Sequence, residues 1–157
     1  MLKDILKRHR ERLFHYLLRM TGDYDLARDI LQECLTRCLG RYGERIDSVA
    51  LLYRVARNLV VDHARKNART SPLGDQTVAD PRSMEHHLMV REAYREMLAA
   101  LQELTFEDRE LLSLVAADEM SYGQIAALLK TTDGAIKVRV HRARKRLRCI
   151  LSKRGRT

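Results

Sequence analysis

The last part of the chain, residues 134–157, restricts the possible fold more than any other segment. It carries ten of the 30 Lys and Arg residues and none of the 21 Asp and Glu residues. Apolar residues recur within it at the three- and four-residue spacing of one helix face, at Ile136, Val140, Ala143 and Leu147. A disordered basic tail has no need of such a stripe, so we predict a helix with one apolar and one basic face. The helix is expected to end near Leu151, followed by a loose basic tail over 152–157.

The residues just upstream predict a second, shorter helix and a tight turn. Ser121 and Gln124 have the spacing of a capping box, in which each side chain satisfies a backbone N–H of the first turn. A helix over 122–129 would follow, and Thr132 in the turn 130–133 is suited to cap the basic helix. Two helices joined by such a turn, the second strongly basic, form the helix-turn-helix arrangement of DNA-binding proteins.

The face of the basic helix opposite the apolar stripe is predicted to enter a DNA groove. Lys and Arg side chains that neutralise phosphates release counterions, which favours binding to a polyanion. The predicted contact residues are Gly134, Lys137, Val138, Arg139, His141, Arg142, Lys145 and Arg146. An αα-hairpin with a solvated basic face is the alternative, but it would not require the charges to be segregated. The chain has a net charge of +9, yet residues 1–133 are almost neutral.

Composition places the rest of the chain among helical proteins of a reducing compartment. Seven glycines and two prolines in 157 residues favour long helices with few tight turns. No apolar run approaches the roughly 20 residues that a membrane span needs, and the N-terminus is too charged for a secretory signal. Three cysteines without a disulfide-like framework fit the cytoplasm.

The predicted fold is all-α, with two small helical domains joined by a flexible linker. Both prolines lie in a stretch of turn-forming residues without helical periodicity. This stretch separates an N-terminal domain, residues 1–67, from a linker, 68–86, and a C-terminal domain, 87–157. Helices are expected over 2–20, 23–42 and 49–67 in the first domain, and over 87–104 and 105–118 before the helix-turn-helix in the second.

Three stretches together resemble the sigma-70 family of bacterial RNA polymerase sigma factors, in particular the extracytoplasmic-function (ECF) type. Residues 27–33, ARDILQE, resemble the family's A-x-D-x-x-Q-E signature. Residues 52–62, LYRVARNLVVD, are similar to its L-Y-R-I-A-R-N-x-x-x-D helix. The segment 121–147 is similar to its C-terminal helix-turn-helix. The order and spacing of the three stretches make the resemblance specific.

The resemblance implies that the protein binds core RNA polymerase and directs it to promoters. The N-terminal domain would dock on the clamp helices of the largest subunit, through Asp25, Asp29, Gln32 and Glu33. It would also read and open the −10 element, through Arg45, Asp47, Ser48, Arg54, Arg57, Asn58 and Arg65. The C-terminal domain would read the −35 element and rest on the flap of the other large subunit. The resemblance also implies control by an anti-sigma factor.

Several residues depart from the family pattern. The loop over 44–48 is shorter than is common, and Leu51 stands where a tryptophan is frequent. Val138 replaces a small polar residue on the basic helix and could touch a thymine methyl group. Lys130 stands where the helix-turn-helix often has glycine, so the turn is expected to be tighter or differently shaped.

Other classes of function fit the sequence less well. No Gly-rich phosphate loop, nucleophile elbow or spaced carboxylate cluster predicts an enzyme. Cys34 and Cys38 could be metal ligands, but their place on an apolar stripe is typical of small buried hydrophobes. We therefore expect no metal, cofactor or small-molecule substrate. A stand-alone helix-turn-helix regulator and an adaptor for an acidic protein are the remaining alternatives.

Overall fold

The computed structural model describes residues 2–41, 49–70 and 92–155. These residues form seven α-helices and no strand, which confirms the all-α prediction. In the N-terminal half the helices are α1 (Leu2–Thr21), α2 (Tyr24–Arg41) and α3 (Val49–Thr70). In the C-terminal half they are α5 (Glu92–Glu103), α6 (Phe106–Ala117), α7 (Tyr122–Leu128) and α8 (Asp133–Arg154). None of them is long and apolar enough to cross a membrane.

Local capping signals set most of the helix boundaries. Gly22 adopts a left-handed φ of +67° after α1, and the side chain of Asp23 accepts a hydrogen bond from the Leu26 amide at the start of α2. Thr105 caps α6 and Thr132 caps α8, in each case by accepting a bond from a backbone N–H of the first turn. All four caps act within one helical turn, and that of Thr132 confirms the prediction.

The C-terminal helix is longer than predicted. Instead of ending near Leu151, α8 continues to Arg154. Arg154 donates hydrogen bonds to Glu96 at 3.0 Å and to Glu103 at 2.8 Å, both on α5. These bonds hold the last turn of α8 against α5, and only residues 156–157 of the predicted tail lie outside the described part of the chain.

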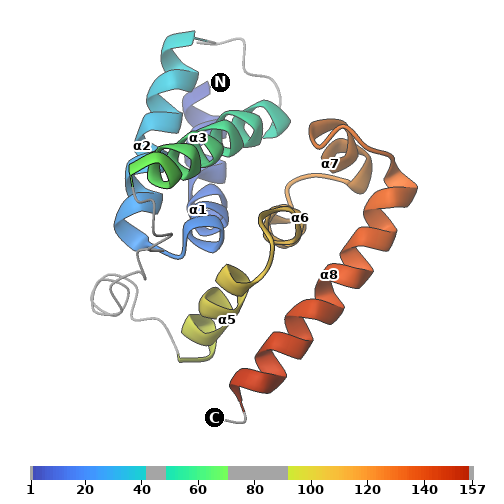
Figure 1. Ribbon diagram of the computed structural model, residues 1–157. Helices are drawn as coiled ribbons and strands as arrows, with labels where there is room; N and C mark the ends of the chain where they lie inside the picture. The colour runs from blue at the N-terminus through green and yellow to red at the C-terminus, as the bar shows by residue number, and fades with distance from the viewer. Residues whose placement is uncertain (1, 42–48, 71–91, 156–157) are drawn as a thin grey trace.

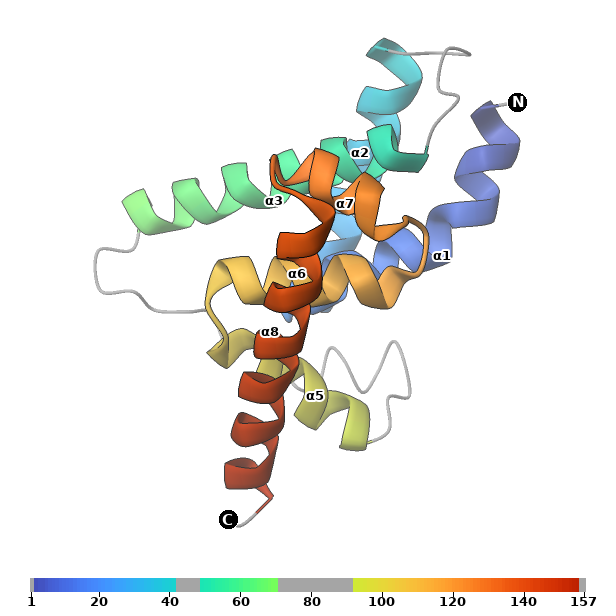
Figure 2. The ribbon, with the colours of Figure 1, turned by 90° about the vertical axis from the view of Figure 1, so that its right-hand side faces the viewer.

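The two halves of the molecule share one apolar core. Leu13, Tyr16 and Leu17 of α1 pack in the same cluster as Leu111 and Leu114 of α6. In Figure 1, α6 lies at the centre of the molecule, between the N-terminal helices and α8. Figure 2 shows α8 crossing in front of α6, with α7 close to α3. The N-terminal and C-terminal halves are therefore in direct contact through α1 and α6.

Candidate nucleic-acid interface

The helix-turn-helix is built as predicted. Ser121 and Gln124 form the complete capping box, with bonds of 3.1 Å and 2.8 Å between each side chain and the other residue's N–H. The apolar stripe of α8 is buried at Ile136, Val140 and Ala143. The opposite face of α8 is consequently turned toward solvent.

The turn between α7 and α8 has a backbone conformation that favours glycine at position 130. Lys130 adopts a left-handed φ of +58°. The Lys130 amide bonds the carbonyl of Ala127 at 3.4 Å, and the Thr131 amide bonds that of Ala126 at 2.9 Å. This pair of bonds is a Schellman motif, which favours glycine because an L-residue is strained in the left-handed region. Lys130 therefore adopts this turn at a strain of roughly 1–2 kcal/mol.

Most of the predicted −35 residues lie on the exposed face of α8. These are Gly134, Lys137, Val138, His141, Arg142 and Lys145. Val138 is one of two large apolar side chains that are exposed in the described residues, at 48%. An apolar side chain among cations suits a thymine methyl group in a major groove.

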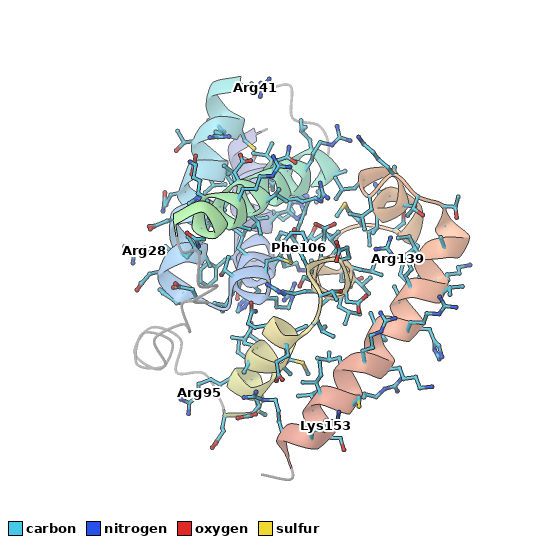
Figure 3. The ribbon with its side chains drawn as sticks, viewed as in Figure 1. Arg28, Arg41, Arg95, Phe106, Arg139 and Lys153 are labelled. Atoms are coloured by element: carbon cyan, nitrogen blue, oxygen red, sulfur yellow. The ribbon has the colours of Figure 1, made fainter. Side chains whose placement is uncertain are left out.

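Two of the predicted −35 arginines lie near acidic residues of α6. Arg146 donates a hydrogen bond of 2.7 Å to Asp108, whose side chain is 10% exposed. Arg139 is half-buried and lies on the side of α8 that faces α6 (Figure 3). Both cations are thus close to acidic side chains of the same molecule.

Some residues of the predicted −10 surface are exposed, whereas Arg57 is bonded to another side chain of the protein. Arg54, Asn58 and Arg65 are exposed on α3. Arg57 is half-buried and bonds Glu110 of α6 through its Nε, at 2.9 Å. The remaining predicted residues of this surface, Arg45, Asp47 and Ser48, lie outside the described part of the chain.

Glu110 is a part of this site that sequence reasoning missed. Its side chain is only 6% exposed. Burial raises its pKa, while the hydrogen bond and charge of Arg57 and the charge of Arg139 act in the opposite direction. A glutamate on an amphipathic helix gives no local signal of a partner 53 residues away.

The predicted docking residues lie on α2 with the geometry of an accessible edge. Asp25, Asp29 and Gln32 are exposed. Glu33 is half-buried. Its carboxylate lies 2.8 Å from the guanidinium of Arg37 and 3.8 Å from the ring nitrogen of His63. Arg28, beside Asp29, points away from the body of the molecule (Figure 3). The edge is therefore polar and mainly acidic, with two cations beside it.

Cys34 and Cys38 are buried in the core on the inner side of α2. The Cys34 thiol lies 3.7 Å from the Leu52 carbonyl, and the hydrogen bond with Cys38, together with burial, raises its pKa. Within the described residues no three His, Cys, Asp or Glu side chains are grouped so that they could hold a metal ion.

The helical order and the exposed basic helix define a two-region DNA-binding protein, and comparisons with known proteins identify its family. The sigma-70 region 2 model matches residues 5–70 and the sigma-70 region 4 model matches residues 94–147. The ECF RNA polymerase sigma factor EcfG of Rhodopseudomonas palustris is 33% identical over 143 residues, covering 87% of this chain and 77% of that protein. The ECF sigma factor SigM of Bacillus subtilis is 26% identical over 157 residues, covering 96% and 94%. The chain belongs to the ECF RNA polymerase sigma factors.

Solved structures are similar over both halves. The sigma factor RpoE of Bartonella quintana, in complex with the anti-sigma factor NepR, matches with a TM-score of 0.79 and 25% identity, covering 96% of each chain. CnrH, in complex with the cytosolic domain of CnrY, matches with a TM-score of 0.66 and 21% identity, covering 97% of this chain and 88% of that one. The second match supports the fold alone.

Proposed function

We propose that this sigma factor binds core RNA polymerase through α2 and directs it to promoters that its two halves recognise. The exposed face of α8 reads the −35 element. The exposed side of α3, with the residues that precede it, reads the −10 element and holds the opened strand. One observation supports this assignment above the others: both sigma-70 regions occur in order, and the second presents a basic helix to solvent.

The charges on each surface indicate which partner it binds. Asp25, Asp29 and Gln32 offer carboxylates and an amide to basic helices, such as the clamp helices of the largest polymerase subunit. The cations of α3 suit the phosphates of a single strand, which must be kept from re-pairing during promoter opening. The C-terminal half rests on the flap of the other large subunit, and polymerase fixes the distance between two weak DNA sites so that they act as one strong site.

The protein acts in the cytoplasm as an initiation factor and not as an enzyme, without a metal or cofactor. Its chemistry is non-covalent, because the proposed surfaces are built from hydrogen-bond donors, acceptors and charges. Control by an anti-sigma factor is part of the proposal. It is supported by the similarity of both halves to a sigma factor solved with such a partner.

Run-off transcription with purified core polymerase and a promoter library tests this function. Wild-type protein should yield discrete transcripts, and their start sites identify the promoters. A stand-alone regulator would bind duplex DNA without yielding transcripts, and an adaptor would bind no duplex DNA even at low salt. Either result overturns the proposal.

A charge-reversed variant tests the docking edge. Asp29→Lys with Glu33→Lys should abolish co-purification with core polymerase, while circular dichroism shows an intact helical fold. The matched control is Glu96→Lys with Glu103→Lys, which makes the same charge change on two half-exposed carboxylates of α5. If the α2 variant still binds polymerase as the control does, the docking surface lies elsewhere.

A further inference from the structure

A cavity of about 330 Å³ lies where α1 meets the end of α6. It is lined by residues of α1 and of the end of α6, namely Arg12, His15, Arg19, Ala116, Ala117 and Asp118. The three positions on α1 are spaced by three and four residues, so they share one face of that helix. Alanine side chains extend only to Cβ, so α6 leaves the space open at this point. The cavity has the size of the smaller ligand sites of proteins.

Arg19 is a half-buried cation that no carboxylate of the described residues neutralises. Burial lowers its pKa, and the charges that act against this shift belong to tyrosine hydroxyls. Its guanidinium bonds one group of the described residues, donating from Nη2 to the Ser113 carbonyl at 3.0 Å. Charges in a protein interior are normally paired, because burial removes their hydration. Arg19 therefore has the charge and the donors to bind an anionic ligand.

Arg109, at the same junction, is a guanidinium whose donors are used by the protein itself. It is also half-buried, and burial lowers its pKa. It donates bonds to the Met20 carbonyl at 2.9 Å, to Oε1 of Gln102 at 3.0 Å and to the Leu104 carbonyl at 3.4 Å. The Nε of Arg109 and that of Arg19 are both buried without a bond, so the two side chains differ at Nη. Arg109 has protein partners there, whereas Arg19 retains donors beside a cavity.

Arg12 brings a second guanidinium to the cavity. Its side chain is 58% exposed, and it lies 3.3 Å from the Glu119 carboxylate and 3.4 Å from the Asp118 carbonyl. Both contacts are long for bonds of a charged donor, so a more strongly charged anion can draw the Arg12 side chain away from them. The Glu119 carboxylate also lies 2.6 Å from Nδ1 of His9, and it keeps this partner when Arg12 turns.

His15 and the end of α6 supply the remaining polar groups. Nδ1 of His15 lies 3.1 Å from the Tyr94 hydroxyl, and its Nε2 has no bond to a described residue. Because α6 ends at Ala117, the carbonyls of Ala116 and Ala117 have no partner within the helix. They are acceptors for the hydroxyl groups of a ligand. The cavity thus combines cationic donors from α1 with neutral acceptors from α6.

We propose that this cavity binds a small phosphorylated metabolite, with its phosphate monoester on Arg12 and Arg19 and its hydroxyl groups at the end of α6. A phosphate monoester carries up to two negative charges and three acceptor oxygens, and guanidinium groups form strong, directional bonds to such oxygens. None of the six lining residues belongs to the predicted docking or DNA surfaces. The site is therefore separate from those of the proposed function.

Isothermal titration calorimetry of the full chain tests the class of ligand, with ribose 5-phosphate and adenosine 5′-monophosphate as probes. At least one of them should bind saturably at millimolar concentrations and raise the thermal midpoint, because a ligand of the folded state stabilises it. Ribose and adenosine, which lack the phosphate, should not bind. Inorganic phosphate should bind at least about threefold more weakly than the better probe, since it lacks the hydroxyl groups for α6. Failure of both probes, or equal binding of the matched compound without phosphate, would overturn the proposal.

Variants test the position of the site. Arg12→Gln and Arg19→Gln should each weaken binding of the better probe by about tenfold, the loss of one bond to a charged group. Arg10→Gln is the matched control, because it makes the same charge change at an exposed position of α1 outside the cavity. It should bind as wild type does. Equal weakening by Arg10→Gln and Arg12→Gln would show a general attraction to a basic protein and would overturn the proposal.

A further variant fills the cavity without removing a charge or a bond. Ala116 lines the cavity and is exposed, so a leucine there can occupy the space of the ligand while the core is unchanged. Ala116→Leu should keep the helical circular dichroism spectrum and lose both the heat of binding and the rise in thermal midpoint. This variant serves as the test if Arg19→Gln, which loses the bond to Ser113, does not fold. Unchanged binding by a folded Ala116→Leu variant would place the ligand elsewhere and refute the assignment.

Discussion

Replacing Gly22 by alanine tests whether the two halves are packed together as described. Gly22 has a φ of +67°, and a Cβ there would lie 2.9 Å from Cδ of Gln102 in the other half. The left-handed backbone strains an alanine by about 1–2 kcal/mol. The Gln102 side chain must also move, and it takes part in the bonds to the Arg19 carbonyl and from Arg109, at 2.9 Å and 3.0 Å. Two lost bonds contribute about 1 kcal/mol each.

The expected loss for Gly22→Ala is therefore about 3–4 kcal/mol in the free energy of unfolding. Urea denaturation followed by circular dichroism measures it. Gly40→Ala is the matched control, because Gly40 lies within α2 and no described atom comes within 4 Å of an added Cβ. That control should gain about 0.5–1 kcal/mol, since alanine is the better helix former.

A double-variant cycle separates the backbone strain from the contact between the halves. In a Gln102→Ala background the clash and both bonds are already absent, so Gly22→Ala should lose only the strain of about 1–2 kcal/mol. If Gly22→Ala instead loses the same free energy in both backgrounds, the side chain of Gln102 does not pack on Gly22 in solution. A Gly22→Ala variant as stable as Gly40→Ala would refute the whole argument.

Three further perturbations have defined outcomes. Lys130→Gly should raise the urea midpoint by an amount equivalent to up to about 1 kcal/mol by removing left-handed strain, and Lys130→Ala, which retains the strain, is its control. Arg142→Ala should weaken −35 binding by about 1–3 kcal/mol in gel-shift titrations, whereas Arg144→Ala, an equal charge change at a position outside the predicted contact set, should weaken it less; equal effects would contradict the assigned face. Burial and the charge of Arg19 lower the pKa of His15, so its neutral form is favoured in the folded protein. Its contribution to stability is complete above its ordinary pKa of 6.5 and decreases as the pH falls below it. The thermal midpoint of His15→Gln should therefore fall less than that of wild type between pH 7 and 5, and parallel curves would show that His15 does not titrate there.

Features encoded by neighbouring residues could be predicted from the sequence. Ser121 and Thr132 act within one helical turn, so their spacing alone identified two caps that the structure contains. The apolar stripe of α8 is likewise encoded by residues close in sequence. The end of α8 could not be predicted in this way, because Arg154 bonds Glu96 and Glu103, which lie 58 and 51 residues away.

The same distinction separates the parts of the candidate site. The cationic face of α8 follows from helical periodicity, and the exposure of Arg142 and Lys145 agrees with it. The engagement of Arg57 and Arg146 depends on carboxylates 53 and 38 residues away. Residue type identified these arginines as phosphate ligands, but only the packing of α6 shows that the protein itself supplies an anion to each.

The shared core also affects how prone the protein is to aggregate. Leu98, Leu111 and Leu114 of the C-terminal half are covered in part by the N-terminal half, in one cluster with Tyr16 and Tyr53. A molecule whose halves separated in solution would present these leucines to every other protein, and such patches promote aggregation. Each half therefore shields apolar side chains of the other half from solvent. The two halves can separate without promoting aggregation only where a partner covers these leucines.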